Sequence, residues 1–104
     1  MFGLYPNSYK IILSIFQKHE NIEKVIIYGS RAKGNYKEGS DIDFTLFGNL
    51  NYDDILKLKH EFEESTIPYL IDISIFSDLQ SKSLIEHINR VGKIFYIKSE
   101  NNSA

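Results

Sequence analysis

Three segments of the chain carry apolar residues at the three- and four-residue spacing of an amphipathic helix. The first begins at Pro6, in a typical helix start, and is expected to end near residues 19–21. The second follows Asn51, which suits the N-cap position, and the third follows Ser81 or Ser83. The apolar stripes are Tyr9, Ile12, Leu13 and Phe16; Ile55, Leu58 and Phe62; and Leu84, Ile85, Ile88 and Val91.

Four other segments carry the apolar runs or alternation of β-strands. Residues 22–28 are apolar on both faces, so we expect a central strand there. A second strand is expected over residues 41–47. A third covers residues 69–76, in which isoleucines at 71, 73 and 75 share one face. Residues 93–97 predict a short edge strand.

The order of these elements predicts one α+β domain with a small mixed sheet flanked by about three to four helices. Gly29-Ser30 is read as a tight turn that opens into a short helical piece, and Gly34 and Gly92 as helix stops. A polar loop is expected over residues 35–40. We expect the domain to span residues 1–98, with residues 99–104 as a frayed polar tail.

Composition narrows the function classes. A chain of 104 residues can bury one modest core, and the absence of cysteine excludes disulfides and thiol chemistry. The net charge of −2 argues against a dedicated nucleic-acid binder, which usually carries a basic surface. The first residues do not resemble a signal peptide, and no apolar run approaches the ~20 residues that span a bilayer. The expectation is therefore a cytoplasmic protein without a membrane partner.

Three aspartates lie on the expected second and third strands. Asp41 and Asp43 are two residues apart, so they point to the same face of the sheet. Two adjacent carboxylates repel each other, and a divalent cation is the obvious compensating charge. Asp72 lies among isoleucines, where an unpaired buried carboxylate would cost several kcal/mol. Placing the third strand beside the second would group all three carboxylates, which could then hold two Mg²⁺ ions. Alternatively, Asp72 guards an edge strand against aggregation.

Gly29-Ser30 and the Asp-Ile-Asp motif at residues 41–43 resemble the signature of the DNA polymerase beta-like nucleotidyltransferase superfamily. The motif GSRAKG…SDIDF is most similar to that of the minimal nucleotidyltransferases, which are typically encoded beside a helical HEPN-domain partner. The resemblance implies that Asp41 and Asp43 hold both Mg²⁺ ions. It also implies that Asp72 completes the catalytic metal site and helps to activate the attacking hydroxyl.

The same resemblance implies that Gly29 and Ser30 hold the triphosphate of an incoming nucleotide. Glycine lets the backbone approach a phosphate closely, and backbone N–H groups at a helix start attract anions. Arg31 and Lys33 lie on the same turn and could neutralise phosphate or the pyrophosphate leaving group. The plainer alternatives are an ordinary turn and solvated basic residues.

The three histidines are poor candidates for metal ligands. His19 and His87 are expected on helices far from the signature, and His60 lies in a charged helix. No pair of them has the spacing of a helical metal site, so solvated or helix-terminal roles are expected.

The resemblance implies Mg²⁺-dependent transfer of AMP from ATP to a hydroxyl, with release of pyrophosphate. Few residues follow the third expected strand, so the acceptor is expected to come from another molecule. For the minimal nucleotidyltransferases that acceptor is a tyrosine of a cognate HEPN toxin, which would make this chain an antitoxin.

Two alternatives are a non-catalytic module that neutralises a helical partner by complex formation, and nucleotidyl transfer to RNA or a small molecule. A homodimer or a hetero-oligomer would suit so small a domain.

Overall fold

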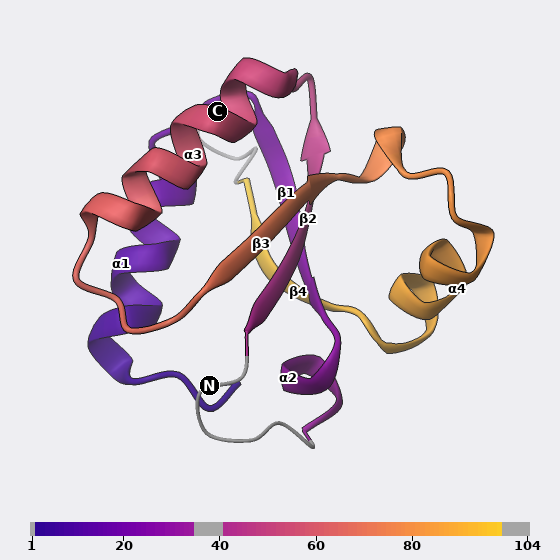
Figure 1. Ribbon diagram of the computed structural model, residues 1–104, viewed down its shortest axis with the longest axis horizontal. Coiled ribbons are helices and arrows are strands. Elements are labelled where there is room, and N and C mark those ends of the chain that lie inside the picture. The colour runs from indigo at the N-terminus through magenta and orange to yellow at the C-terminus, as the bar shows by residue number, and fades with distance from the viewer. Residues whose placement is uncertain (1, 35–40, 99–104) are drawn as a thin grey trace, which may run out of the picture.

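A four-stranded mixed sheet with helices on both faces forms the framework of the protein (Figure 1). The computed structural model describes residues 2–34 and 41–98, so the expected loop at 35–40 and the tail at 99–104 lie outside the described residues. The α+β fold class and the mixed sheet are confirmed. The elements are α1 (Pro6–Gln17), β1 (Ile22–Tyr28), α2 (Ser30–Lys33), β2 (Ile42–Gly48), α3 (Tyr52–Glu64), β3 (Ile71–Ile75), the 3₁₀-helix η1 (Phe76–Asp78), α4 (Lys82–Val91) and β4 (Lys93–Ile97).

The strands are arranged in the order β3-β2-β1-β4. β1 pairs antiparallel with β2 and with β4, whereas β2 and β3 are parallel. A parallel pair needs a crossover connection, and α3 supplies it. The predictions of a central first strand, an edge strand near the C-terminus and a third strand beside the second are all confirmed.

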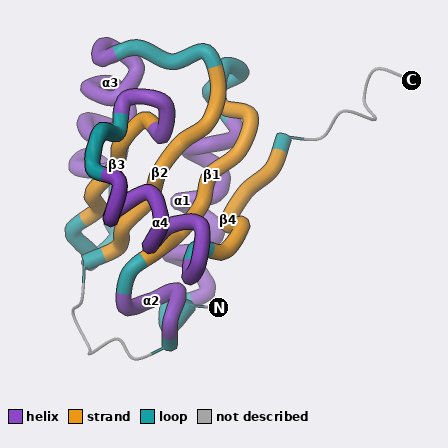
Figure 2. The backbone as a smooth tube through the Cα atoms, turned by 90° about the vertical axis from the view of Figure 1, so that its right-hand side faces the viewer, coloured by secondary structure: helices purple, strands orange, loops and turns teal. Residues whose placement is uncertain are grey.

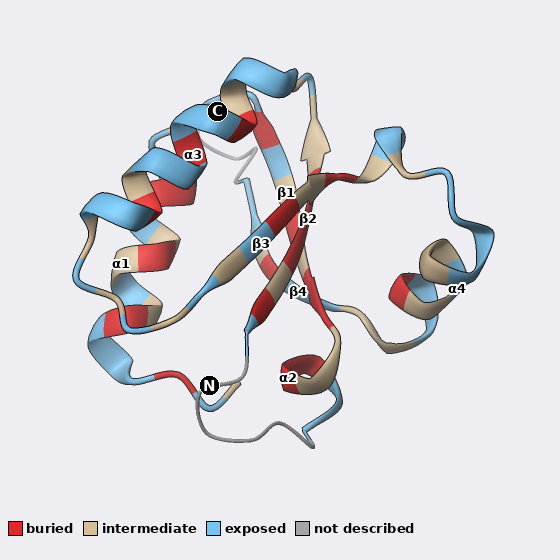
Figure 3. Cartoon of the chain, in the orientation of Figure 1, coloured by how far each residue is buried: buried red, intermediate tan, exposed pale blue. Residues whose placement is uncertain are grey.

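The main core lies between the sheet and the layer formed by α1 and α3 (Figure 3). Phe16 of α1 is fully buried at its centre. Its ring lies 5.1 Å from Phe44 of β2, 5.5 Å from Phe62 of α3 and 6.0 Å from Phe95 of β4, in edge-to-face arrangements. Such pairs stabilise a core beyond their buried area, by roughly 0.5–1.5 kcal/mol each. One aromatic residue thus ties both helices to the sheet.

The opposite face of the sheet carries α4, which packs against β1 (Figure 2). Gly92 caps this helix, as predicted, although its φ of −66° is not the left-handed conformation of a glycine stop. A Cβ at Gly92 would lie 2.4 Å from the Ile88 carbonyl oxygen and 2.6 Å from Cγ2 of Ile26. The glycine is therefore needed because the end of α4 approaches β1 closely.

Local side-chain bonds set the other helix ends. The Asn51 side chain accepts from the Asp54 N–H at 3.0 Å, and Asp54 accepts from the Asn51 N–H at 2.9 Å, which forms a capping box. Ser81 caps α4, which decides between the two serines. α1 ends at Gln17, so the expected end near residues 19–21 was too late. None of the helices over residues 2–34 and 41–98 combines the length and apolar character needed to cross a lipid bilayer.

Candidate active site

The Gly-Ser turn and the aspartate-bearing segments meet at one end of the sheet. β2 and β3 both begin at this end, and β1, which is antiparallel to β2, ends there. The register pairs Asp43 with Tyr28 on one side and with Asp72 on the other. Gly29 and Ser30 follow Tyr28 directly. The fold therefore brings the Gly-Ser turn beside the aspartates of β2 and β3.

Asp43 and Asp72 share the face of the sheet that carries α4. Directly paired residues on neighbouring strands point to the same side. Two register pairs further along, the Ser74 hydroxyl donates to Oγ1 of Thr45 at 3.1 Å on that same face. The intervening Ile73 points into the core on the other side. Both carboxylates therefore lie on the face opposite the main core.

The environment of Asp43 is crowded with negative charge. Its pKa is raised, first by burial and then by the charges of Asp72 and Asp41, while His87 acts in the opposite direction. Asp43 is half-buried and Asp72 is exposed. A carboxylate whose pKa is raised by two other carboxylates is a site with surplus negative charge. Such a site favours a bound cation.

The carboxylates fit Mg²⁺ by their chemistry, because this ion prefers oxygen ligands and because Asp72 and Asp41 add negative charge beside Asp43. Asp41 is exposed and precedes β2, next to the undescribed residues 35–40. Within residues 2–34 and 41–98, no three histidine, cysteine, aspartate or glutamate side chains are arranged to hold a metal ion. The roles of Asp41, Asp43 and Asp72 as metal ligands stay predictions.

Gly29 occupies a position that no other residue suits. Its φ is +79°, in the region that residues with a Cβ rarely adopt. A Cβ there would lie 2.5 Å from Oδ2 of Asp43. Gly29 thus allows the turn to approach the Asp43 carboxylate. Ser30 then begins α2, and Gly34 ends it in the left-handed conformation, with φ +87°, as predicted.

The two basic residues of α2 lie in different surroundings. Lys33 is exposed, whereas Arg31 is only 3% exposed. Nη1 of Arg31 donates to the Phe2 carbonyl oxygen at 3.1 Å, and its guanidinium lies 4.9 Å from the centre of the Tyr69 ring. The alternative of a solvated side chain is therefore wrong for Arg31.

Two residues that the sequence does not mark as candidates, Tyr28 and His87, lie at this site. Tyr28 is buried, and its pKa is raised by burial and by the charge of Asp43, less by that of Asp72, while a hydrogen bond with Ser74 lowers it. The His87 ring lies 6.4 Å from the Tyr28 ring, at an angle of 81°. The expectation that His87 lies far from the signature is wrong, because α4 folds back onto β1. No local pattern reports that packing.

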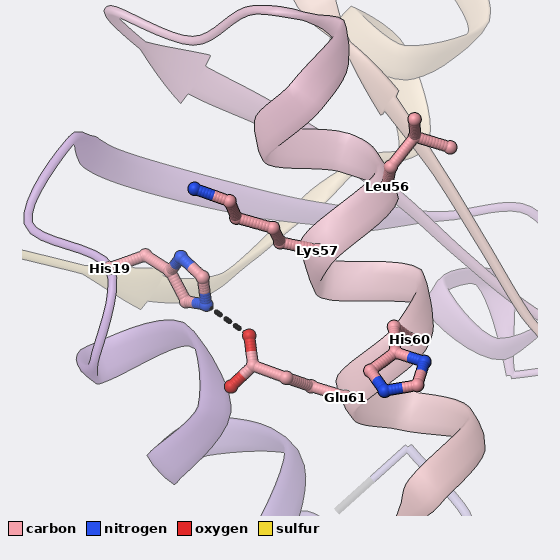
Figure 4. Close-up of a pocket in the computed structure, with 5 residues that line it drawn as sticks. All are labelled: His19, Leu56, Lys57, His60 and Glu61. Atoms are coloured by element: carbon pink, nitrogen blue, oxygen red, sulfur yellow. Dashed lines mark hydrogen bonds and ion pairs between the residues drawn. The ribbon is translucent and has the colours of Figure 1, made fainter.

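The other two histidines lie elsewhere, as expected, although His19 follows α1 instead of belonging to it. His19 and His60 help to line a pocket of ≈ 460 Å³, together with Leu56, Lys57 and Glu61 (Figure 4). His19 precedes the start of β1, whereas Gly29 follows its end. The pocket is therefore separate from the end of the sheet that carries Asp43 and Asp72. Within the pocket, His19 pairs with Glu61.

Comparisons with known proteins identify a related family and a shared fold. A family model described as polymerase beta, nucleotidyltransferase, matches residues 10–101. A Methanocaldococcus jannaschii protein, named as a candidate protein adenylyltransferase, is 43% identical over 37 residues. That match covers 36% of this chain and 37% of the relative, so it spans little more than a third of either protein.

Solved structures share the fold. A chain of a toxin–antitoxin complex crystallised with AMP-PNP superposes with a TM-score of 0.70 at 15% identity, over 91% of this chain and 77% of the other. A chain from the complex of a tri-AMPylated Shewanella oneidensis HEPN toxin with its MNT antitoxin gives a TM-score of 0.64 at 13% identity, over 93% and 76% respectively. At these identities the likeness concerns the fold.

Proposed function

The chain belongs to the polymerase beta nucleotidyltransferase family, and from this premise we propose that it transfers AMP from ATP to a tyrosine hydroxyl of a HEPN toxin, as an antitoxin. The observation that carries the proposal is the pairing of Asp43 with Asp72 at the end of the sheet where the chain turns at Gly29. Adjacent carboxylates disfavour the fold unless a cation joins them, so their pairing supports a functional role.

The proposed roles divide the site into two halves. Asp41 and Asp43 would hold two Mg²⁺ ions, and Asp72 would complete the catalytic metal site. When bound, Mg²⁺ would neutralise the phosphates and stabilise the charge that develops on the attacking and leaving oxygens. On the other half, the backbone at Gly29 and the Ser30 hydroxyl would bind the triphosphate, and the exposed Lys33 would offset its charge.

The reaction itself is an in-line displacement at the α-phosphorus. The acceptor hydroxyl oxygen forms a bond to that phosphorus, and the bond to the oxygen bridging to the β-phosphate breaks. Pyrophosphate leaves with the electron pair of that bond. Asp72, which is exposed at the edge strand, would orient the acceptor hydroxyl and help to remove its proton, which passes to solvent.

The choice of acceptor rests on the relatives. One superposed chain comes from a complex with an AMPylated HEPN toxin, and the curated relative is named for protein adenylylation. The AMP-PNP in another of those complexes supports an adenine nucleotide as donor. A cytoplasmic location stays a prediction, as does the oligomeric state, either a homodimer or a hetero-oligomer with the toxin.

The test incubates the chain with ATP labelled at the α-phosphate, Mg²⁺ and a candidate HEPN partner, sought among the proteins encoded beside its gene. We expect label on a tyrosine of the partner, and none with Asp43→Ala or in EDTA. If the partner stays unlabelled in the presence of the wild-type chain, the proposed transfer of AMP to it is wrong. Neutralisation of the toxin by Asp43→Ala as well as by the wild type would instead support the binding-module alternative.

A further inference from the structure

Arg31 is a buried cation beside the proposed nucleotide site. It lies two residues after Gly29, within the four-residue helix α2, and it is 3% exposed. Burial of an unpaired charge is strongly unfavourable, so a guanidinium in this position requires specific partners. Its partners show what the residue holds together.

Two of those contacts join α2 to distant parts of the chain. Nη1 of Arg31 donates to the Phe2 carbonyl oxygen at 3.1 Å, and the guanidinium lies 4.9 Å from the centre of the Tyr69 ring. A guanidinium over an aromatic face is attracted to the ring, and the attraction increases when water is excluded. Arg31 therefore connects α2 with the N-terminal segment and with the approach to β3.

Tyr69 is in turn firmly connected to β3. It precedes Asp72 by three residues, and the intervening Leu70 carbonyl accepts from the Ile42 N–H at 3.0 Å, which extends the pairing with β2. The Tyr69 hydroxyl accepts from the Tyr5 N–H at 3.2 Å. A displacement of Tyr69 would therefore displace the start of β3, and Asp72 with it.

We propose that Arg31 is a positioning residue that clamps α2 against Tyr69 and so sets the spacing between the Gly29-Ser30 turn and the carboxylate of Asp72. This role rests on the proposed function, because it matters for activity only if both halves bind one nucleotide. Lysine would not replace arginine, because an ammonium group lacks the flat face that lies on the ring.

The clamp is tested by ATP affinity in a double-mutant cycle of Arg31→Met and Tyr69→Leu, with Mg²⁺ present. Each single variant is expected to weaken ATP binding by roughly tenfold to thirtyfold, and the upper value is the equivalent of a lost desolvated cation–π contact. The double variant is expected to be no weaker than the worse single variant, because both changes release the same contact.

Lys33→Met provides the matched comparison on the same helix. Lys33 is exposed and is proposed to act on phosphate directly, so its effect should multiply with that of Tyr69→Leu. Tyr69→Phe keeps the ring and loses only the hydroxyl bond to Tyr5, and it should retain ATP affinity close to the wild type. Thermal melts of every variant, and binding measured well below each Tm, separate weakened positioning from unfolding.

The outcomes distinguish the two proposals. Multiplying effects of Arg31→Met and Tyr69→Leu, or wild-type affinity in Tyr69→Leu, would overturn the clamp and leave the proposed function intact. A wild-type chain that fails to bind ATP would overturn the proposed function and the clamp together. ATP binding with the expected non-additivity supports the clamp even if no label reaches the HEPN partner.

Discussion

Asp43 of β2 and Asp72 of β3 are register partners on adjacent parallel strands, on the same face of the sheet. Like charges in this position destabilise a sheet, and the raised pKa of Asp43, set first by burial and then by Asp72, reports the same conflict. Because β3 is an edge strand, the charge on Asp72 also discourages pairing with other chains. The fold therefore places together two charges whose repulsion a bound cation would remove.

The repulsion predicts that Asp72→Asn stabilises the metal-free protein while abolishing AMP transfer. Removal of one charge of the pair is expected to add about 0.2–1 kcal/mol, or a few degrees in Tm for a domain of this size. Thermal melts in EDTA measure this gain, and added Mg²⁺ should raise the Tm of the wild type more than that of the variant. Asp53→Asn, at the start of α3, should instead lower the Tm slightly through the helix dipole. A loss of stability in Asp72→Asn would contradict the repulsion.

The two glycines that flank α2 predict a sharp difference in activity. Gly29→Ala and Gly34→Ala both place alanine at a positive φ: the cost is about 1–2 kcal/mol for the left-handed Gly34. The cost is larger for Gly29, whose φ of +79° and ψ of −156° lie in a region that only glycine readily adopts. Only the Cβ at Gly29 meets the Asp43 carboxylate, at 2.5 Å, whereas a Cβ at Gly34 has no atom within 4 Å. Gly29→Ala is expected to lower transfer by about 10²-fold or more, because small displacements of reacting groups have effects of that size. Gly34→Ala should lose stability and keep transfer within a few-fold of the wild type. Equal losses of transfer in the two variants would refute the close approach of Gly29 to Asp43.

Much of the fold could be predicted from local patterns. The alternating isoleucines around Asp72 predict a strand, and a carboxylate on such a strand is unfavourable without polar or charged partners. This requirement predicts that β3 lies beside β2, as the register confirms. The double-sided apolar run at residues 22–28 likewise predicts the central strand. These inferences succeed because a strand displays its burial directly in its sequence.

The surroundings of single side chains could not be predicted in the same way. Arg31 follows a turn and resembles a solvated loop residue, and its burial depends on Tyr69, which is far away in sequence. His87 approaches Tyr28 only because α4 packs on the carboxylate face of the sheet. Such positions depend on how elements pack, which a helical or strand period does not encode.

The packing of α4 leads to a prediction about Gly92. Its replacement by alanine would place a Cβ 2.6 Å from Cγ2 of Ile26 and 2.4 Å from the Ile88 carbonyl oxygen. The end of α4 would have to move away from β1, at a cost of about 1–3 kcal/mol. His87 lies on the same helix, and its charge acts to lower the pKa of Asp43, so a shift of α4 should also alter ATP binding. Chemical denaturation and ATP titration measure both effects, and unchanged stability would show that α4 is not held by this contact.

Glu61 of α3 pairs with Lys18 and His19, which follow α1, and these contacts predict a pH-dependent part of the stability. Glu61 accepts from His19 and lies 2.9 Å from Nζ of Lys18 (Figure 4 shows the His19 contact). Burial acts to raise the pKa of Glu61, but the hydrogen bonds and charges of Lys18 and His19 outweigh it, so the pKa is lowered from its usual 4.5. A lowered pKa in the folded state means that the ionised carboxylate stabilises the fold above pH 4.5.

Glu61→Gln is therefore expected to lose stability at neutral pH and to match the wild type in strong acid. The loss at pH 7 should be about 0.5–1 kcal/mol, as for ion pairs near the surface. As the pH falls below 4.5 and through the lowered pKa of Glu61, the wild type loses this contribution and the two denaturation curves converge. Glu63→Gln, an exposed position on the same helix, should stay within about 0.5 kcal/mol of the wild type. A difference between Glu61→Gln and the wild type that persists unchanged at low pH would mean that the glutamine disturbs packing, because a lost charge interaction cannot outlast protonation of the carboxylate.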